Sequence, residues 1–330
     1  MNTQPDHPLA DPTSADQSPP DLSILIVSYQ TREMTLACLR SVMAETRVPF
    51  EILLVDNASP DGSAAAVAAE FPSVQVMAEA ENHGFAGANN LAAARARGEM
   101  LLLLNPDTLV LDGAIDTLVA YAARHPDARI WGGRTVFADG TLNPASCWHK
   151  MSLWGLVSQA LGLSSLFRGS ALFNPEAYGG WDRLAERQVD IVSGCFLMIS
   201  RADWQALGGF HPDFFMYGEE ADLCLRAAKD LGAAPRVTPQ AVIVHHGGAS
   251  EKVRADKMVR LMTAKMLLIR RHFPIWQRGL AGTLFTAWPL SRWLALSVLS
   301  RLTASPARQG GARTWGEIWA RRNEWRADPV

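Results

Sequence analysis

The sequence has few cysteines, and none of them form a closely spaced pair. Cys38, Cys147, Cys195 and Cys224 are the only four cysteines among 330 residues, and no CxxC motif occurs. Structural zinc sites draw their ligands from closely spaced cysteine and histidine pairs. We therefore expect reduced thiols, as in a cytosolic protein, and no structural zinc site.

The chain also lacks an excess of positive charge. It carries 31 lysines and arginines against 33 aspartates and glutamates, a formal net charge of −2. This balance argues against a general nucleic-acid binder, which presents a basic surface to phosphates. Between residues 252 and 326, however, basic residues outnumber acidic ones and tryptophans gather. That local bias indicates an anionic surface or partner.

The first residues lack the charged-then-apolar pattern of a secretory signal. Residues 1–21 are rich in proline, aspartate and serine. This composition is typical of disordered segments. We expect a disordered tail there, and a protein that faces the cytosol.

An uninterrupted apolar run of membrane-spanning length is missing as well. Residues 280–302 are strongly apolar but contain Pro289, Arg292 and Arg301. A spanning helix needs roughly 20 apolar residues, and an arginine near its centre is costly. Tryptophans beside arginines, from Trp276 onward, favour helices that lie at a membrane interface. The alternative is a helical subdomain packed on the rest of the protein.

Apolar runs alternate with helical spacing through the first 128 residues. Strands are predicted at 22–28, 51–56, 74–77 and 100–104, and helices at 34–46, 63–70, 91–97 and 114–123. A glycine-rich loop over 81–90 precedes the third helix. This alternation predicts an α/β fold with a doubly wound, mostly parallel sheet.

The pattern changes beyond Arg129. We predict a strand pair over 131–142, strands at 189–200 and 242–246, helices at 201–207 and 219–231, and an apolar insert without a clear period at 151–173. Helices are predicted from residue 254 onward, with an apolar stripe beside basic residues. The predicted divisions are a tail (1–21), a sheet domain (22–250) and a helical C-terminal extension (251–330).

Asp107 is the first candidate site residue. The strand at 100–104 runs directly into Asn105, Pro106 and Asp107. Proline has no backbone N–H and ends strand pairing, so Asp107 stands at the carboxyl edge of the sheet, where ligands of such folds bind. A divalent cation held there would neutralise a diphosphate leaving group. The alternative is an ordinary turn aspartate.

Two further segments follow strands in the same half. Asp56 ends the strand at 51–56 and can accept a hydrogen bond from a base or ribose, or else form an Asx turn. Residues 82–90 contain three asparagines and two glycines before a helix. Their backbone N–H groups can receive a phosphate or hydroxyl, although glycine loops of this kind are common.

Glu219, Glu220 and Asp222 open a predicted helix. The helix dipole favours acidic residues in a first turn, and Asp222 can pair with Arg226 one turn later. The aromatic-rich run at 210–217 indicates a walled pocket, which raises the pKa of a carboxyl group and makes it a better base.

His245 and His246 end the last predicted strand. Gly247 and Gly248 follow them directly and allow a ligand to approach the backbone. A histidine in this position is either a ligand or an ordinary packed residue.

Nine motifs follow one another between residues 22 and 250. They are Ile26-Val-Ser-Tyr-Gln30, Val55-Asp-Asn-Ala-Ser59, Asn82-His-Gly-Phe-Ala-Gly87, Leu104-Asn-Pro-Asp107, Val192-Ser-Gly-Cys195, Gly208-Gly-Phe210, Phe214-Phe-Met-Tyr-Gly-Glu219, Asp222-Leu-Cys-Leu-Arg226 and His245-His-Gly-Gly248. In this order they resemble the family-2 glycosyltransferases, most closely their rhamnosyltransferase-like branch. The tail and the C-terminal helices lie outside the resemblance.

The resemblance implies a GT-A fold and an inverting transfer of a sugar from a nucleotide-diphosphate donor. The donor would be a dTDP- or UDP-sugar, with rhamnose as the sugar that the branch suggests. The acceptor would be a glycan or a lipid-linked glycan in cell-surface polysaccharide synthesis. Residues 22–128 would bind the nucleotide sugar, and residues 129–250 would supply the acceptor side and the catalytic groups.

The resemblance also implies roles for single residues. The donor-binding set would be Ser28, Asp56, Asn57, Asn82, Gly84, Asn89, Asn105 and Asp107, with Asp56 on the nucleobase. Asp107 would hold Mg²⁺ or Mn²⁺, with His245 or His246 completing the metal or diphosphate site. The acidic group at Glu219, Glu220 and Asp222 would supply the base that deprotonates the acceptor.

The chain departs from the family at two positions. Glu219 and Glu220 stand where the family usually has Glu-Asp, so the base is one methylene longer, and Gln30 stands where asparagine is frequent. A misplacement of about 1 Å can cost ~100-fold in rate. We rank Glu220 first as the base, Asp222 second and loss of activity third.

Two other functions remain as alternatives. A catalytically silent member of the fold would bind a nucleotide sugar or scaffold a membrane assembly, and the Glu220 departure is its only support. A nucleotidyltransferase would need a glycine-rich basic loop after the first strand, which residues 28–33 lack. We expect a metal-dependent glycosyltransferase in peripheral contact with the cytosolic face of the plasma membrane.

Overall fold

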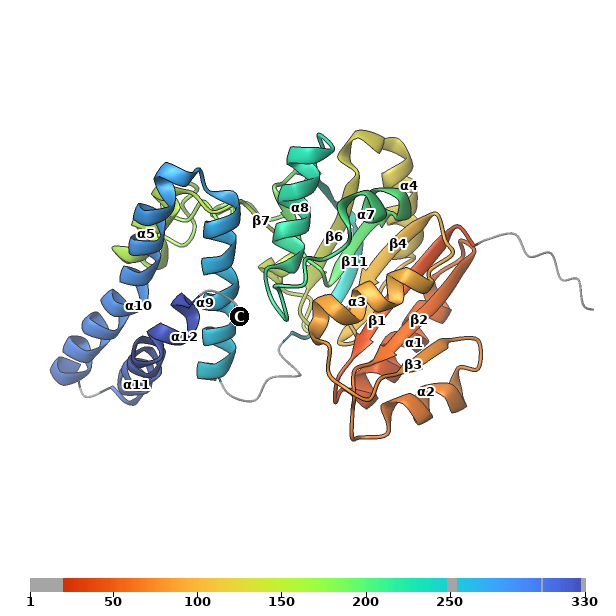
Figure 1. The fold of residues 1–330 in the computed structure, drawn as a ribbon, viewed down its shortest axis with the longest axis horizontal. Coiled ribbons are helices and arrows are strands. Elements are labelled where there is room, and N and C mark those ends of the chain that lie inside the picture. Colours follow the sequence, from red (N-terminus) through yellow and green to blue (C-terminus); the bar gives the residue numbers. More distant parts are fainter. Residues whose placement is uncertain (1–19, 248–253, 304, 328–330) are drawn as a thin grey trace, which may run out of the picture.

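A nine-stranded sheet forms the centre of the larger lobe of this computed structural model, which describes residues 20–247, 254–303 and 305–327 (Figure 1). The strands are β1 (Leu22–Ser28), β2 (Phe50–Asp56), β3 (Gln75–Ala78), β4 (Met100–Leu104), β5 (Thr108–Val110), β6 (Ile130–Val136), β8 (Arg187–Gln188), β10 (Phe196–Ser200) and β11 (Arg236–His245). Their order is β3-β2-β1-β4-β10-β6-β11-β5, with β8 attached to β11. β1 to β4 are parallel, whereas β10 and β5 run antiparallel to their neighbours. The predicted mostly parallel sheet is confirmed.

Helices cover both faces of the sheet because its central strands are apolar on both sides. In β1, Leu22, Ile24 and Ile26 join one core cluster, and Leu25 and Val27 join the other. The first face carries α1 (Arg32–Glu45), α2 (Ser63–Glu70) and α4 (Ala114–Arg124); the second carries α3 (Gly84–Arg95), α7 (Arg201–Leu207) and α8 (Glu219–Asp230). Side chains that alternate along a strand point to opposite faces, so a continuous apolar run requires two covering layers.

Several predicted bounds differ from the structure. Helix α3 begins at Gly84, inside the predicted loop, and the strand predicted at 189–200 is divided into β9 (Ile191–Val192) and β10. β9 pairs instead with β7 (Cys147–Trp148) in a separate two-stranded sheet. The strand pair predicted over 131–142 reduces to β6 and a single bridge between Val136 and Leu142. Residues 1–19 of the predicted disordered tail lie outside the described residues.

The C-terminal extension forms a helical lobe beside the sheet lobe (Figure 1). It comprises α9 (Arg254–His272), α10 (Ile275–Thr303), α11 (Pro306–Ala320) and α12 (Arg322–Arg326), and two helices of the insert, α5 (Leu153–Ala160) and α6 (Leu163–Leu166), precede it in sequence. Leu156 of α5 packs in one cluster with Met262, Phe285, Ile318 and Trp325 of these helices. The insert therefore shares a core with the extension.

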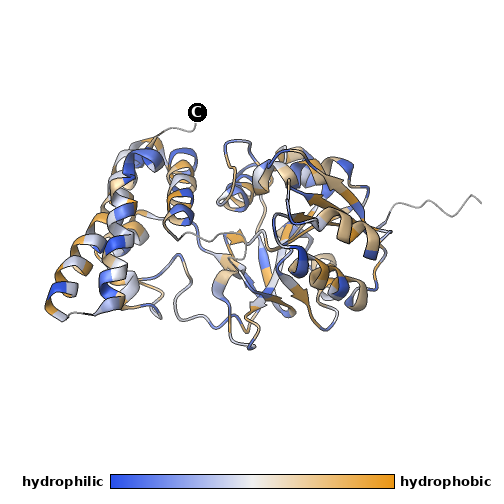
Figure 2. Cartoon of the chain, turned by 90° about the horizontal axis from the view of Figure 1, so that it is seen from below, coloured by the Kyte–Doolittle hydropathy of each residue, from blue (hydrophilic) through white to orange (hydrophobic). Residues whose placement is uncertain are grey.

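The helical lobe does not contain a membrane span within the part of the chain that the structure describes. Figure 2 shows hydrophobic and hydrophilic residues interspersed along its helices. No described helix is long and apolar enough to cross a bilayer. Pro289 lies inside α10 and is buried against the neighbouring helices.

The two lobes are joined where α8 and α9 run side by side (Figure 1). Asp222 of α8 is fully buried, and its Oδ2 accepts a hydrogen bond from Arg226 Nε at 2.7 Å. Its Oδ1 accepts from Arg271 Nε at 3.0 Å and from His272 Nε2 at 2.8 Å, both at the end of α9. Burial alone would raise the pKa of Asp222, but hydrogen bonds from His272 and Arg226 hold it well below its ordinary value. An ionised Asp222 thus ties the helical lobe to α8.

We expect the Asp222→Asn variant to lose about 2–3 kcal/mol of unfolding free energy, because it leaves Arg271 and Arg226 without a carboxylate. The loss should be largest at neutral pH. A carboxyl whose pKa is depressed by folding contributes stability above its unfolded pKa of about 3.9, and this contribution is lost as the pH falls below that value.

Urea unfolding at pH 7 and at about pH 2.5, which lies below the unfolded pKa, measures both effects. Asp230→Asn is the matched control, since Asp230 is exposed at the other end of the same helix, and its unfolding free energy should change by less than about 0.5 kcal/mol. Equal midpoints for the two variants would show that Asp222 does not join the lobes.

Candidate functional site

A cleft of about 580 Å³ opens at the carboxyl edge of the sheet. Its lining includes the predicted residues Asn57, Asn82, Asn105, Asp107, Glu219, Glu220, His245 and His246. These residues come from the ends of β2, β4 and β11, the approach to α3 and the start of α8. Ligand sites of open α/β sheets lie at this edge. The structure thus gathers side chains that are up to 189 positions apart, from Asn57 to His246, into one cleft.

The short strand β5 places Asp107 beside His245. After Pro106 the chain turns and β5 pairs antiparallel with β11, so that Thr108 lies opposite His245. His245 Nε2 then lies 3.5 Å from Asp107 Oδ1, and the Gly247 N–H donates to Asp107 Oδ2 at 2.9 Å. The predicted pairing of these two residues follows from strand register.

The charges of Asp107 and His245 stabilise each other. Burial would raise the pKa of Asp107, but the hydrogen bond to His245 and the Gly247 N–H lower it. Burial likewise opposes a charged His245, yet the Cys195 sulfur and the Asp107 carboxylate raise the pKa of His245 to about 10. Asp107 is therefore ionised, and the His245 nitrogen that faces it must be free of a proton when it ligates a cation.

The donor atoms near Asp107 fit a hard divalent cation in part. The described residues contain no group of three or more His, Cys, Asp or Glu side chains that could hold a metal alone. Asp107 and His245 supply a carboxylate and an imidazole, and the buried Asn105 Oδ1 beside them has no hydrogen-bond partner. Mg²⁺ is commonly bound by one or two carboxylates and completes its shell with water and substrate phosphates. The set therefore fits a cation that arrives with a diphosphate.

Asn57 and Asn82 form a rigid corner of the cleft. Asn57 Nδ2 donates to Asn82 Oδ1 at 2.9 Å, and Asn57 Oδ1 accepts from the His83 N–H at 2.8 Å. Asn82 Oδ1 also accepts from the Gly84 N–H at 2.9 Å. These bonds satisfy N–H groups at the start of α3, which explains why that helix begins earlier than predicted.

Gly84 is required for the shape of this corner. Its φ is +70°, and a Cβ there would lie 2.2 Å from the Phe215 carbonyl oxygen. The same oxygen accepts a hydrogen bond from the Phe85 N–H at 2.8 Å. A side chain at position 84 would push apart α3 and the segment that leads into α8.

Four predicted donor-binding residues do not line this cleft: Gly84, described above, and three that are engaged within the fold. Ser28 is buried and hydrogen-bonds to the hydroxyls of Thr31 and Thr35. Asp56 accepts one backbone N–H on each oxygen, from Ser59 and Ala64, the Asx-turn alternative of the sequence. Asn89 donates to the Phe85 carbonyl within α3.

Glu219 and Glu220 enter the cleft from the first turn of α8. Two successive left-handed residues, Tyr217 (φ 72°) and Gly218 (φ 81°), turn the chain into this helix. Burial and then repulsion from Glu220 raise the pKa of Glu219 well above its ordinary value. Burial also raises the pKa of Glu220, but backbone N–H groups of the helix start and a hydrogen bond from Glu219 oppose the rise. Of the two carboxyls, Glu219 therefore holds a proton more readily, and Glu220 ionises first.

Asp222 does not share this position. Asp222 lies two residues after Glu220 in α8, and it does not line the cleft. Both of its oxygens accept hydrogen bonds from Arg226, Arg271 and His272. The ranking of Asp222 as the second candidate base did not anticipate these partners on α9.

Further residues line the cleft that were not predicted as site residues, although Met216 and Tyr217 belong to the aromatic-rich run that predicted a walled pocket. They include Tyr29, Thr31, Phe85, Phe137, Asn143, Trp148, Ser193, Met216, Tyr217 and Lys257. Most lie in loops between strands, where no periodicity indicates the direction of a side chain. The signal that the sequence does offer is an aromatic residue next to a motif glycine or glutamate, as at Phe85 and Tyr217.

The arrangement of the sheet is shared with solved glycosyltransferases. A mannosyltransferase from Pyrobaculum calidifontis, solved in complex with GDP-Man and Mn²⁺, superposes with a TM-score of 0.57 at 17% identity, covering 94% of this chain and 89% of that one. At this identity the likeness concerns the fold. Together with the sheet order and the cleft at its carboxyl edge, it identifies a GT-A glycosyltransferase fold.

The family follows from the sequence itself. The model of the family described as glycosyl transferase family 2 matches residues 23–205. The chain belongs to glycosyl transferase family 2.

Two curated relatives are similar over much of the chain. The N-acetylglucosaminyl-diphospho-decaprenol L-rhamnosyltransferase of Mycobacterium tuberculosis is 27% identical over 284 residues, 80% of this chain and 89% of the relative. An O-antigen biosynthesis protein of Myxococcus xanthus is 28% identical over 240 residues, 72% of this chain and 18% of that protein. The predicted likeness to the rhamnosyltransferase branch is confirmed.

We expect the Gly84→Ala variant to lose about 2–4 kcal/mol of unfolding free energy, because left-handed strain and a steric clash add together. Gly140→Ala is the matched control. Gly140 has a similar φ of +79° with nothing within 4 Å of the added Cβ, so only the strain of about 1–2 kcal/mol should appear. Chemical denaturation measures both variants, and equal losses would mean that the Phe215 carbonyl moves away freely.

Proposed function

We propose that this glycosyltransferase transfers a sugar with inversion from a nucleotide-diphosphate donor to an acceptor hydroxyl in cell-surface polysaccharide synthesis. One observation carries the proposal. The Asp107–His245 pair and the Glu219–Glu220 pair line the same cleft as the Asn57–Asn82 corner. A single displacement needs charge neutralisation on the leaving-group side and a base on the acceptor side, and the two acidic sites supply these roles.

On the donor side, Asp107 and His245 would hold Mg²⁺ or Mn²⁺, with Asn105 next to them. When bound, the cation neutralises the negative charge that develops on the leaving diphosphate. Asn57 and Asn82 stand where the ends of β1 and β2 meet and are suited to the nucleoside. The Mn²⁺ in the Pyrobaculum mannosyltransferase complex is consistent with this assignment. Residues 22–128 are thus proposed as the donor half.

On the acceptor side, Glu220 is the proposed base. The hydrogen bond from Glu219 and the backbone N–H groups of the helix start favour the ionised form of Glu220, and an ionised carboxylate can take the proton of the acceptor hydroxyl. The hydroxyl oxygen then forms the new bond to the anomeric carbon while the bond to the diphosphate oxygen breaks and its electron pair leaves with the phosphate. Asp222 is not proposed as the base, because its oxygens accept hydrogen bonds from two arginines and His272.

The substrate classes are proposed from the relatives. The Mycobacterium tuberculosis relative is, by its name, a rhamnosyltransferase that acts on a diphospholipid-linked N-acetylglucosamine. We therefore propose a dTDP- or UDP-sugar donor, with rhamnose as the first sugar to test, and a lipid-linked acceptor. Residues 129–250 are proposed as the acceptor and catalytic half.

Contact with the cytosolic face of the plasma membrane is proposed for the helical lobe. Ile275, Trp276 and Leu280 at the start of α10 are 81%, 80% and 55% exposed. Further along the same helix, Leu294, Val298 and Leu302 recur at intervals of four residues and are also exposed. An exposed tryptophan and aliphatic stripe near arginines suits the interface of an anionic bilayer.

Release of nucleoside diphosphate from a panel of nucleotide sugars tests the transferase function. With Mg²⁺ or Mn²⁺ present, one donor should be turned over, and EDTA should stop the reaction. Asp107→Asn should lower the rate by about 100-fold or more, because the diphosphate loses its charge partner. Asp139→Asn, in an exposed turn, is the control and should keep the wild-type rate.

Two results would contradict the proposal. Unimpaired turnover by Asp107→Asn would remove the metal role from this residue. Donor binding without release, even with lipid-linked acceptors supplied, would favour the catalytically silent alternative.

Vesicle binding tests the membrane contact. The double variant Trp276→Ser and Leu280→Ser should bind vesicles that contain anionic phospholipid at least about 10-fold more weakly, because two large apolar side chains no longer enter the interface. Leu184→Ser is the control, since Leu184 is 62% exposed on the sheet lobe. Equal binding by both variants would mean that another surface meets the membrane.

A further inference from the structure

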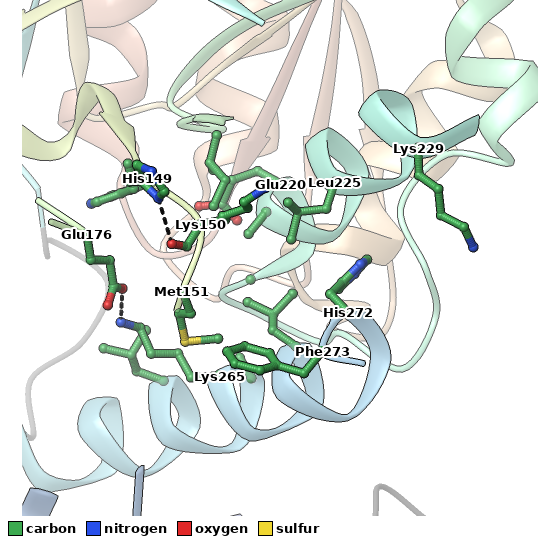
Figure 3. Close-up of a pocket in the computed structure, with 17 residues that line it drawn as sticks. His149, Lys150, Met151, Glu176, Glu220, Leu225, Lys229, Lys265, His272 and Phe273 are labelled. Carbon is green, nitrogen blue, oxygen red and sulfur yellow. Dashed lines mark hydrogen bonds and ion pairs between the residues drawn. The ribbon is translucent and has the colours of Figure 1, made fainter. Parts of the chain in front are cut away.

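A second pocket of about 400 Å³ adjoins the donor cleft (Figure 3). It lies between α8, α9 and the segment 148–151, and it is separate from the Asp107–His245 pair. Four residues line both cavities: Trp148, Gly218, Glu220 and Leu261. Glu220 therefore stands in the wall between a cleft that suits a nucleotide sugar and a pocket that needs another occupant.

The lining of this pocket is apolar along α8 and α9. Met151, Leu225, Leu261, Leu268 and Phe273 supply most of its wall. An apolar wall of this kind offers few partners for the many hydroxyls of a free oligosaccharide, because each unpaired polar group that loses water is costly. A ligand that carries an apolar chain fits it better.

Charged residues of α8, α9 and the segment 148–151 also line the pocket. Lys150, Lys229 and Lys265 are among its lining residues, against Glu176 and Glu220. Figure 3 shows Lys265 directed at Glu176, with which it forms an ion pair, and Lys229 directed away from the other labelled side chains. Lys150 has no ion-pair partner among the described residues, and its backbone N–H is fixed by Asp190 Oδ2 at 2.8 Å. An uncompensated ammonium beside the pocket suits an anionic group.

The apolar wall continues toward the exposed end of the helical lobe. Phe273 lines the pocket at the end of α9. Ile275 and Trp276, two and three residues later, are among the most exposed apolar residues of the chain. A chain that leaves the pocket past Phe273 would therefore reach the surface proposed to meet the bilayer.

We propose that this second pocket binds the acceptor as a lipid-linked glycosyl phosphate. The sugar hydroxyl lies at Glu220, the phosphate lies at Lys150, and the first part of the lipid chain follows Leu261 and Phe273. This inference rests on the proposed function, since it assigns the second substrate of the same reaction. It makes Lys150 a specificity residue that selects phosphorylated acceptors over neutral glycosides.

The test compares two acceptors that differ in their phosphate. One is a sugar linked through diphosphate to a short isoprenoid, and the other is the same sugar as an uncharged alkyl glycoside of similar length. Lys150→Gln should raise the KM for the phosphorylated acceptor about 10-fold, with kcat unchanged, because one charge-assisted contact of about 1.4 kcal/mol is lost. The KM for the uncharged glycoside should stay the same.

Lys229→Gln is the matched control, because Lys229 is an exposed lysine of the same pocket that points away from it. Its KM for both acceptors should equal that of the wild type. The inference is overturned if Lys150→Gln and Lys229→Gln have the same KM for the phosphorylated acceptor. It is also overturned if the wild type has equal KM values for the uncharged glycoside and the phosphorylated acceptor.

A further measurement distinguishes failure of the pocket assignment from failure of the proposed transferase function. The wild type is also assayed for slow hydrolysis of the nucleotide sugar without any acceptor. Hydrolysis together with no preference for phosphorylated acceptors would reject the pocket assignment alone. Absence of both hydrolysis and transfer for every donor would reject the transferase function itself.

Discussion

The buried carboxylate of Asp222 fixes α8 against α9 through Arg271 and His272, and the Glu219–Glu220 pair depends on where α8 begins. Glu219 and Glu220 lie in the first turn of this helix, three and two residues before Asp222. A buried ion pair often adds little net stability compared with an apolar contact of similar volume. Its geometric demand is strict, however, because Arg226, Arg271 and His272 must all converge on two oxygen atoms. The position of the proposed base is thus set by a contact with the C-terminal extension.

The two carboxylates of the first turn divide their roles through their surroundings. Glu219 is almost completely buried, whereas Glu220 is closer to the helix-start N–H groups and borders both cavities. A protonated neighbour that donates to the reactive carboxylate keeps the latter ionised at a position where two full charges would repel each other. The extra methylene of Glu220, compared with the usual aspartate, extends its oxygens toward the second pocket. Glu220 in place of the usual aspartate is therefore compatible with a base that contacts an acceptor bound in the second pocket.

Much of the fold and the donor side could be predicted from the sequence because those signals are local. The apolar runs at β1, β2 and β4 and the proline before Asp107 indicated strand ends without any knowledge of distant contacts. The pairing of β5 with β11, which brings Asp107 to His245, joins residues 137 positions apart at Thr108 and His245 and left no periodic signal. The partners of Asp222 on α9 were not predicted for the same reason, since Arg271 and His272 lie about 50 positions away on another helix. The second pocket was not predicted, because its walls come from five separate segments.

The shared core of α5 with the C-terminal helices affects how this protein can be modified or recombined. Leu156 of the insert packs with Phe285 and Trp325, and Arg271 and His272 complete the surroundings of Asp222. The C-terminal extension is therefore not an independent unit that can be exchanged without affecting the catalytic domain. A chimera that took its last 80 or so residues from a relative would inherit a foreign partner for Asp222 and a foreign wall for the second pocket, so acceptor choice and base placement would change together.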